Sequence, residues 1–237
     1  MNFETMDKIK ITERVKAIKE RLIDSTPQIE SDRARLITES YKMTENLPVI
    51  KRRSAAFRHI LENLPVTIRE DELIVGSATK KSRSCQTFPE YSFEWLEAEF
   101  DTVETRSADP FYISEETKRT LHEVYKYWKG KTTSELATSY LAPEAILAME
   151  HNIFTPGNYF YNGVGHLCVK YDEVLAIGFD GIKARAVEEL LKLNAGDADY
   201  GSRTAFLKAV ITTLDAACHY AERYALLALD MAEKETD

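Results

Sequence analysis

The chain has 237 residues, of which 44% are hydrophobic, and its 31 basic and 39 acidic residues give a formal net charge of -8. A chain of this size can bury a sizeable core as one large domain, or it can form a piece of a larger one. The negative charge and the lack of a long basic block exclude nucleic acid as an expected partner.

The three cysteines, Cys85, Cys168 and Cys218, are far apart in the sequence and odd in number. This pattern fits neither a disulfide framework nor a CxxC metal clip. The polar, charged start of the sequence lacks the apolar core of a signal peptide, and no stretch approaches the roughly 18 apolar residues of a membrane span. We therefore expect a cytoplasmic protein that has no membrane partner.

The first part of the chain has the pattern of amphipathic helices. Apolar residues at three- and four-residue spacing predict a helix in each of the segments 12–28, 31–48 and 49–65. The pattern then changes in "DELIVGSATK", where an apolar run at 73–75 is closed by Gly76. Such a run is typical of a short buried strand. The expected fold class is therefore mainly α, with a small β component (α+β).

The middle of the chain contains several helix start and stop signals. An aromatic-rich stretch that ends at Phe100 leads into a short helix, and a stronger helix is expected to begin after Ser114 and to stop at Gly130. Thr132 stands three residues before Glu135, which is the spacing of a capping box. A further helix is therefore predicted to start at this threonine.

Two helices are predicted in the last third of the chain. One face of the segment 172–193 carries the apolar residues Leu175, Ile182, Ala186 and Leu190. Gly178 and Gly181 each cost this helix about 1 kcal/mol relative to alanine, so we expect them to allow close packing against another backbone. The final helix, after the polar break at 194–202, is apolar on more than one side and is expected to need further protein around it.

The candidate site lies between these parts, in "FTPGNYFYNGVGHLCVKYDEVLAIGFDGI", residues 154–182. His166 follows two glycines that give the backbone freedom, and the polar and aromatic side chains before it could line a small pocket for a hydroxylated ligand: Asn158, Tyr159, Tyr161 and Asn162. The alternative is a buried histidine that is hydrogen-bonded to a carbonyl group. The residue types alone do not decide between these two interpretations.

Other chemistries find less support in the sequence. The glycines at 163 and 165 lack the third glycine of a dinucleotide fingerprint, because Cys168 occupies its place. Cys168 alternates with apolar neighbours, a pattern typical of a small buried hydrophobic residue. The other histidines have no histidine or acidic partner at metal-ligand spacing, so no metal site is predicted.

Three blocks together resemble one known family: "RLITESYKMTENLPVIKRRSAAFRHILENLPVTIREDELIVGSATKKSRSCQTFPE", "WKGKTTSELATSY" and the candidate loop. They resemble the N-terminal part of glycyl radical enzymes of the pyruvate formate-lyase superfamily. Within it they are most similar to the coenzyme-B12-independent glycerol and propane-1,2-diol dehydratases, from about Ile11 to Leu229. The resemblance implies an α/β barrel of two antiparallel five-stranded halves wrapped in helices. Residues 1–237 would be its N-terminal helical portion, with an early strand and one wall of the pocket.

The resemblance also implies a chemistry. In this family an activating enzyme that uses S-adenosylmethionine and an iron–sulfur cluster installs a glycyl radical, which passes to a cysteine. The thiyl radical then takes a hydrogen from a diol, and the neighbouring hydroxyl leaves as water to give an aldehyde. His166 aligns with a histidine that hydrogen-bonds the substrate and is the candidate acid for the departing hydroxyl, a role that suits its ordinary pKa near 6.5. Asn158 and Tyr161 are implied as pocket lining.

The sequence departs from the family in one respect. It contains neither the Gly-Cys-Val block of the catalytic cysteine nor the arginine-led loop of the radical glycine, and Cys168 belongs to neither. The expectation is therefore a fragment, a truncated product or one piece of a split enzyme, which is inert alone and binds no cofactor directly.

The expected partners are a small diol, the radical-activating enzyme, the rest of the enzyme as a second chain, and further copies in a homo-oligomer. Two alternatives remain open at this point. One is another branch of the superfamily: a lyase for choline, isethionate or hydroxyproline, or a formate acetyltransferase. The other is a non-catalytic scaffold or assembly subunit.

Overall fold

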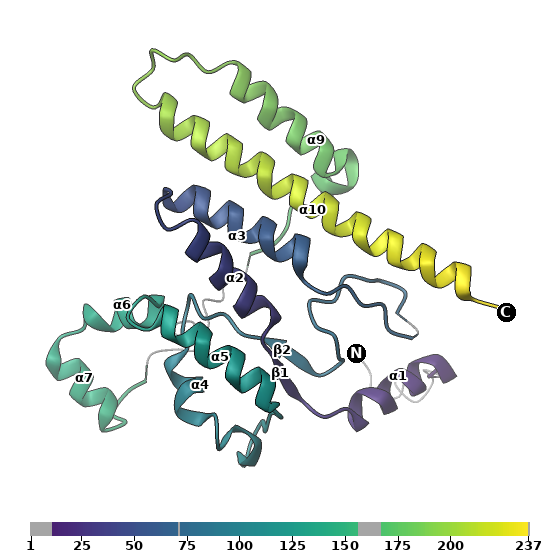
Figure 1. Cartoon of the computed structure of the whole chain (residues 1–237), viewed down its shortest axis with the longest axis vertical. Coiled ribbons are helices and arrows are strands. Elements are labelled where there is room, and N and C mark those ends of the chain that lie inside the picture. Colours follow the sequence, from purple (N-terminus) through teal and green to yellow (C-terminus); the bar gives the residue numbers. More distant parts are fainter. Residues whose placement is uncertain (1–10, 71, 156–166, 237) are drawn as a thin grey trace, which may run out of the picture.

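The computed structural model describes residues 11–70, 72–155 and 167–236 (Figure 1). Within these ranges the chain is mainly helical and has one small two-stranded sheet, so the predicted fold class is confirmed. The elements in chain order are α1 Glu13–Asp24, β1 Gln28–Glu30, α2 Asp32–Met43, α3 Val49–Asn63, β2 Ser84–Gln86, α4 Glu94–Glu99, the 3-10 helix Val103–Thr105, α5 Glu115–Trp128, α6 Thr133–Ser139, α7 Pro143–Glu150, α9 Tyr171–Leu191 and α10 Tyr200–Lys234.

The predicted helix starts are confirmed by their caps. The side chain of Ser114 accepts a hydrogen bond from the backbone N–H of Thr117 at 3.1 Å, at the start of α5. Thr132 and Glu135 form the complete capping box of α6. In both cases a side-chain oxygen satisfies a backbone donor that has no partner within the helix. Gly130, with φ +77°, follows the end of α5, because only glycine adopts this conformation at little cost.

The two strands hold distant parts of the chain together. β1 pairs with β2 in parallel, with Ile29 opposite Cys85, and the backbone of Gln28 also bridges to Tyr112. The strand predicted at 73–75 is wrong: this segment is irregular, and the side chains of Leu73 and Ile74 are 80% and 93% exposed. A short apolar run forms a strand only where another strand pairs with it, and the described residues provide none here.

The hydrophobic core lies where α2, α4 and α5 meet the second half of α3, at Ala56 and Ile60. Its largest fully buried side chains include Phe93, Leu36, Leu96, Ile113 and Leu121. Phe93 stacks on Tyr125 with ring centroids 5.3 Å apart. At the end of α5, Trp128 donates its indole N–H to Thr38 Oγ1 of α2 at 2.8 Å, so a polar group in the core is satisfied.

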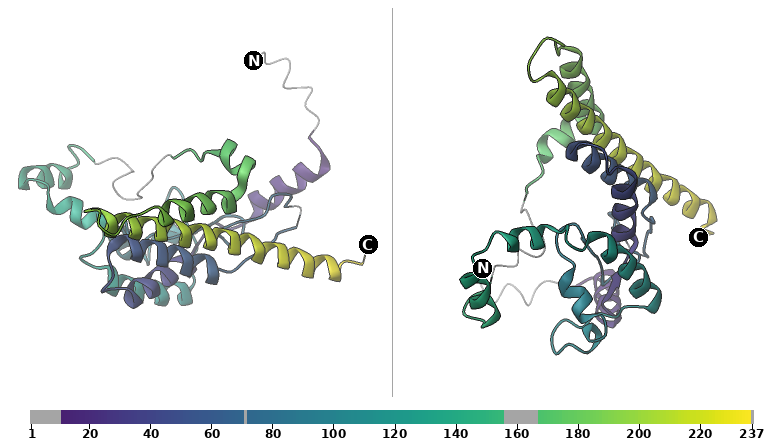
Figure 2. Two further views of the ribbon diagram at one scale, coloured as in Figure 1. Left: turned by 90° about the horizontal axis from the view of Figure 1, so that it is seen from above. Right: turned by 60° about the vertical axis from the view of Figure 1, so that its left-hand side comes forward.

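A second group of helices, α9 and α10, packs on the α3 side of the molecule, away from α4 to α7 (Figure 1). α10 runs beside both α3 and α9, whereas α4 to α7 lie beyond α2 (Figures 1 and 2). Arg223 of α10 donates to the carbonyls of Leu61 and Leu64 at 2.6 and 2.8 Å, and Tyr224 donates to the carbonyl of Ser77 at 2.7 Å. These bonds attach α10 to the C-terminal end of α3 and to the loop that follows it.

Gly178 of α9 acts differently from the prediction. Gly178 has φ +66° and ψ 178° and divides the helix at a kink, and a Cβ atom at this position would meet nothing within 4 Å. The three atoms nearest to a Cβ at Gly181 all belong to the side chain of Ile177, one turn earlier in the same helix, and the nearest would lie 2.7 Å away. Gly178 therefore does not serve close packing against another backbone. Gly178 is instead required by a backbone conformation that is essentially restricted to glycine.

Candidate functional site

The three predicted site residues, Asn158, Tyr161 and His166, lie outside the described residues. The structure does describe both ends of the segment that carries them. The geometry of the candidate site therefore rests on α7, which leads into the segment, and on α9, which follows it.

The chain enters the segment from α7. Pro143 occupies the first turn of this helix, and His151 ends it with its backbone N–H bonded to the carbonyls of Leu147 and Met149. Asn152 has φ +54°, a left-handed conformation that is common just after a helix. Ile153 then leaves the turn with 75% of its surface exposed, so the approach to the candidate site is an uncovered apolar stretch.

The chain leaves the segment through an equally uncovered stretch. Leu167 is 92% exposed, Val169 is 54% exposed, and α9 begins at Tyr171. Cys168 is also exposed, so the prediction that it is a small buried residue is wrong. Alternation with apolar residues indicates burial only where another surface covers them, and the described residues place none there.

Ion pairs fix the direction in which α9 starts. Glu173, before the kink at Gly178, pairs with Lys170 at 3.2 Å and with Arg185 on the other side of the kink. The hydrogen bond from Lys170 and then that from Arg185 hold the pKa of Glu173 below its usual value. The first two turns of α9 are thus tied to the second half of the helix, although the backbone between them is not helical.

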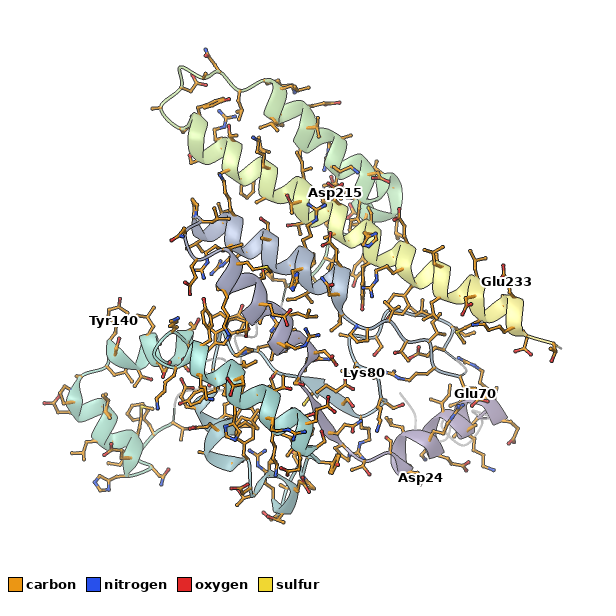
Figure 3. All side chains as sticks on the ribbon, viewed as in Figure 1. Asp24, Glu70, Lys80, Tyr140, Asp215 and Glu233 are labelled. Carbon is orange, nitrogen blue, oxygen red and sulfur yellow. The ribbon has the colours of Figure 1, made fainter. Side chains whose placement is uncertain are left out.

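A second set of charges attaches α9 to α10. Lys183 donates to Asp180 Oδ1 at 2.9 Å and to Asp215 Oδ1 at 3.0 Å. Asp215 is labelled on α10 in Figure 3. Hydrogen bonds to these two carboxylates raise the pKa of Lys183, so it stays charged at any physiological pH. Lys183 therefore joins α9 to α10, and nothing in the arrangement activates its amino group as a base.

The remaining cysteines are not activated as nucleophiles. Burial, followed by the charge of Glu30, raises the pKa of the Cys85 thiol, and burial, followed by Asp180, raises the pKa of Cys218. Both thiols are therefore protonated at neutral pH. Within the part of the chain that the structure describes, no group of three or more histidine, cysteine, aspartate or glutamate residues could hold a metal ion. No helix there is long and apolar enough to cross a bilayer.

One surface feature was missed by the sequence analysis. Two cavities, of about 370 and 350 Å³, lie on either side of the outer face of α3, and Arg53 and Phe57 line both. Two apolar residues on the same face two turns apart, Ile50 and Phe57, beside the core stripe of α3, are the signal that could have indicated it.

The comparisons with known proteins agree on one family. The family model described as pyruvate formate lyase-like matches residues 7–237. A solved structure on 1,2-propanediol dehydration in Roseburia inulinivorans is 59% identical, with a TM-score of 0.91, over 97% of this chain and 27% of that one. The glycerol-bound form of the B12-independent glycerol dehydratase from Clostridium butyricum is 49% identical, with a TM-score of 0.90, over 97% of this chain and 29% of that one.

A curated relative is more distant. The (2S)-3-sulfopropanediol dehydratase of Klebsiella oxytoca is 34% identical over 94% of this chain and 28% of its own length. The chain thus spans between a quarter and a third of the length of the proteins it matches. The fold implied by the resemblance, the N-terminal helical portion of a glycyl radical enzyme, is confirmed by the two solved structures.

Proposed function

Because the chain belongs to the pyruvate formate lyase-like family, we propose that it supplies the N-terminal part of a glycyl radical diol dehydratase. The reaction would convert glycerol or propane-1,2-diol into an aldehyde and water. The observation that carries this proposal is the identity of 59% and 49% with two structures that concern these diols, against 34% with the dehydratase of a sulfonated diol. Other branches are disfavoured because an isethionate sulfite-lyase and a hydroxyproline dehydratase are only 32% and 31% identical to this chain.

The proposed catalytic residue of this chain is His166. It would hydrogen-bond the diol and give a proton to the departing hydroxyl, with Asn158 and Tyr161 as lining of the pocket. A histidine suits this step because it can hold or give a proton near neutral pH.

The radical chemistry would be supplied by residues other than these 237. When present, a glycyl radical and the cysteine that it oxidises supply abstraction of a hydrogen atom from the hydroxyl-bearing carbon. The given residues contain neither block, and the S-adenosylmethionine and the iron–sulfur cluster would belong to the activating enzyme. We propose that these residues are inert by themselves. In the assembled enzyme, in the cytoplasm, they would contribute binding of the diol, proton transfer and exclusion of water from the active site.

A second candidate function is that of a non-catalytic assembly subunit. The specific observation in its favour is the uncovered apolar surface at the end of α10, where Leu226 is 65% exposed and Leu229 is 61% exposed. Such a surface is typical of a contact with another polypeptide. The two candidates differ in whether the assembled protein acquires a glycyl radical.

The first test is recovery of the protein from its native cells, by pull-down and intact-mass analysis. A longer chain, or a tightly bound second chain, that can be activated to a glycyl radical and dehydrates a diol would support the proposal. Recovery of only a 27.1 kDa species, without radical formation, would contradict it and favour the assembly role.

The second test addresses His166 in the activated enzyme. We expect His166→Ala to lower the rate of diol dehydration by about 10²- to 10⁴-fold while the radical content, measured by electron paramagnetic resonance, stays unchanged. The matched control is His219→Ala, since His219 lies on α10 with 51% of its side chain exposed. Unchanged turnover in the His166 variant would disprove its role.

A further inference from the structure

The outer face of α3 carries a groove that the proposed function does not use. We define the α3 groove as the two cavities that meet at Arg53 and Phe57. One lies between α3, α2 and the start of α6, and the other lies between α3 and α10. In the views of Figures 1 and 2, α3 and α10 run side by side along this face.

The walls of the groove are largely apolar on the α10 side and mixed on the α2 side, where Arg33, Glu90 and Lys131 also line the cavity. On the α10 side the lining is Ile50, Ser54, Phe57, Phe206, Ala209, Val210, Thr213 and Leu214, with Arg53 as the only charged residue among them. On the α2 side the floor includes the buried Ile60 and Trp128. Phe57 and Phe206 are 41% and 56% exposed. Aromatic side chains that stay this exposed at two adjoining cavities favour a covering partner.

The charges of the groove are unbalanced. Arg33 is neutralised by Glu90, with which it forms two hydrogen bonds, and it stacks on Phe88 at 3.8 Å. Arg53 has no ion pair or hydrogen bond with any residue that the structure describes. Lys131 also lacks a carboxylate partner within that part of the chain, and its Nζ lies 3.9 Å over the ring of Tyr127. The groove thus presents two uncompensated cations in a chain of net charge -8.

We infer that the α3 groove binds a polypeptide segment in which apolar side chains flank a carboxylate that pairs with Arg53. A single small acid would fill one cavity and leave the other open, whereas a segment can place side chains in both and its carboxylate between them. The inference rests on the proposed function in one respect: the segment belongs to the part of the dehydratase outside residues 1–237. The proteins that this chain matches are more than three times its length and have such polypeptide to supply.

The test is site-specific crosslinking in the native host. A photo-crosslinking phenylalanine analogue replaces Phe57 in one experiment and Phe206 in another, and the crosslinked peptides are sequenced by mass spectrometry. We expect both positions to capture the same segment, outside residues 1–237, with an aspartate or glutamate within a few residues of apolar side chains. The same analogue at Tyr112, which is 48% exposed and does not line the groove, must capture a different peptide or none.

A charge reversal tests the role of the arginine. Arg53→Glu in the Phe206 crosslinking background is expected to lower the crosslink yield about tenfold or more, because it places like charges together. Arg58→Glu is the matched control: it is the same change on the same helix, at a residue that pairs with Glu62 and does not line the groove. Equal effects of the two substitutions would overturn the inference.

The crosslinks also separate this inference from the proposed function. Capture of residues from a second copy of 1–237, or of no peptide, overturns the groove assignment even if the enzyme dehydrates diols. Capture of the expected kind of segment from a chain that forms no glycyl radical supports the groove and refutes the dehydratase.

Discussion

The hydrogen bond between Trp128 and Thr38 is a sensitive point of the core. Both residues are only 4% exposed, and the indole N–H donates to Thr38 Oγ1 at 2.8 Å. Thr38→Val keeps the shape of the side chain but removes the acceptor, which leaves a buried donor without a partner. Such a loss costs about 1–3 kcal/mol, so the folded-to-unfolded ratio should fall by roughly 5- to 150-fold. Trp128 also lines the α3 groove, so Thr38→Val would remove one contact that holds this side of the groove in place.

The assay is urea unfolding followed by far-ultraviolet circular dichroism. Thr38→Ser is the matched control, because it retains the hydroxyl group and removes only a methyl group, worth about 0.8 kcal/mol. A double-mutant cycle with Trp128→Phe isolates the bond itself, since the phenylalanine has no N–H to leave unsatisfied. If Thr38→Val is as costly with Phe at position 128 as with Trp, the hydrogen bond is not the cause and the reasoning is refuted.

Two further predictions concern the kink at Gly178 and the carboxylate of Glu94, which accepts hydrogen bonds from Thr132 and Ser134 of α6 and its cap. Gly178→Ala should destabilise the chain by about 1–3 kcal/mol through backbone strain alone. Gly201→Ala, in α10 at ordinary φ, should instead stabilise it by about 0.4–1 kcal/mol. Opposite signs of the two changes in the free energy of unfolding, measured with urea, would confirm this, and stabilisation by both substitutions would contradict it. Burial would raise the pKa of Glu94, but hydrogen bonds outweigh it and lower the pKa from 4.5; the donors are Thr132, the backbone N–H of Glu94 itself, that of the preceding Phe93, and Ser134. A lowered folded-state pKa gives stability that is present above pH 4.5 and lost as the pH falls through the lower value, so the deficit of Glu94→Gln should be full at pH 7 and shrink below pH 4.5. A deficit that is independent of pH in unfolding measurements would exclude this assignment.

The helices were predictable because their signals are local. Ser114, Thr132 and Glu135 satisfy backbone donors within three residues of themselves, so their role can be read without knowing the rest of the fold. The family resemblance was equally accessible, because it depends on long blocks of sequence. His166 remains a prediction, since its neighbourhood lies outside the described residues.

Features that depend on distant neighbours were not predictable. Leu73, Ile74 and Val75 have the composition of a strand, yet no described strand pairs with them. Cys168 alternates with apolar residues but is exposed, because nothing described covers it. Burial is a property of two surfaces, and a sequence pattern describes only one of them.

The sequence by itself determined the helical class, the positions of the caps and the family, because periodicity, capping and long matching blocks are written in consecutive residues. Only the tertiary structure decided that Gly178 kinks α9, that Lys183 ties α9 to α10, and that Arg53 lines two cavities without a carboxylate partner among the described residues. These features arise from contacts between residues far apart in the chain, and their energies depend on distances that folding alone sets.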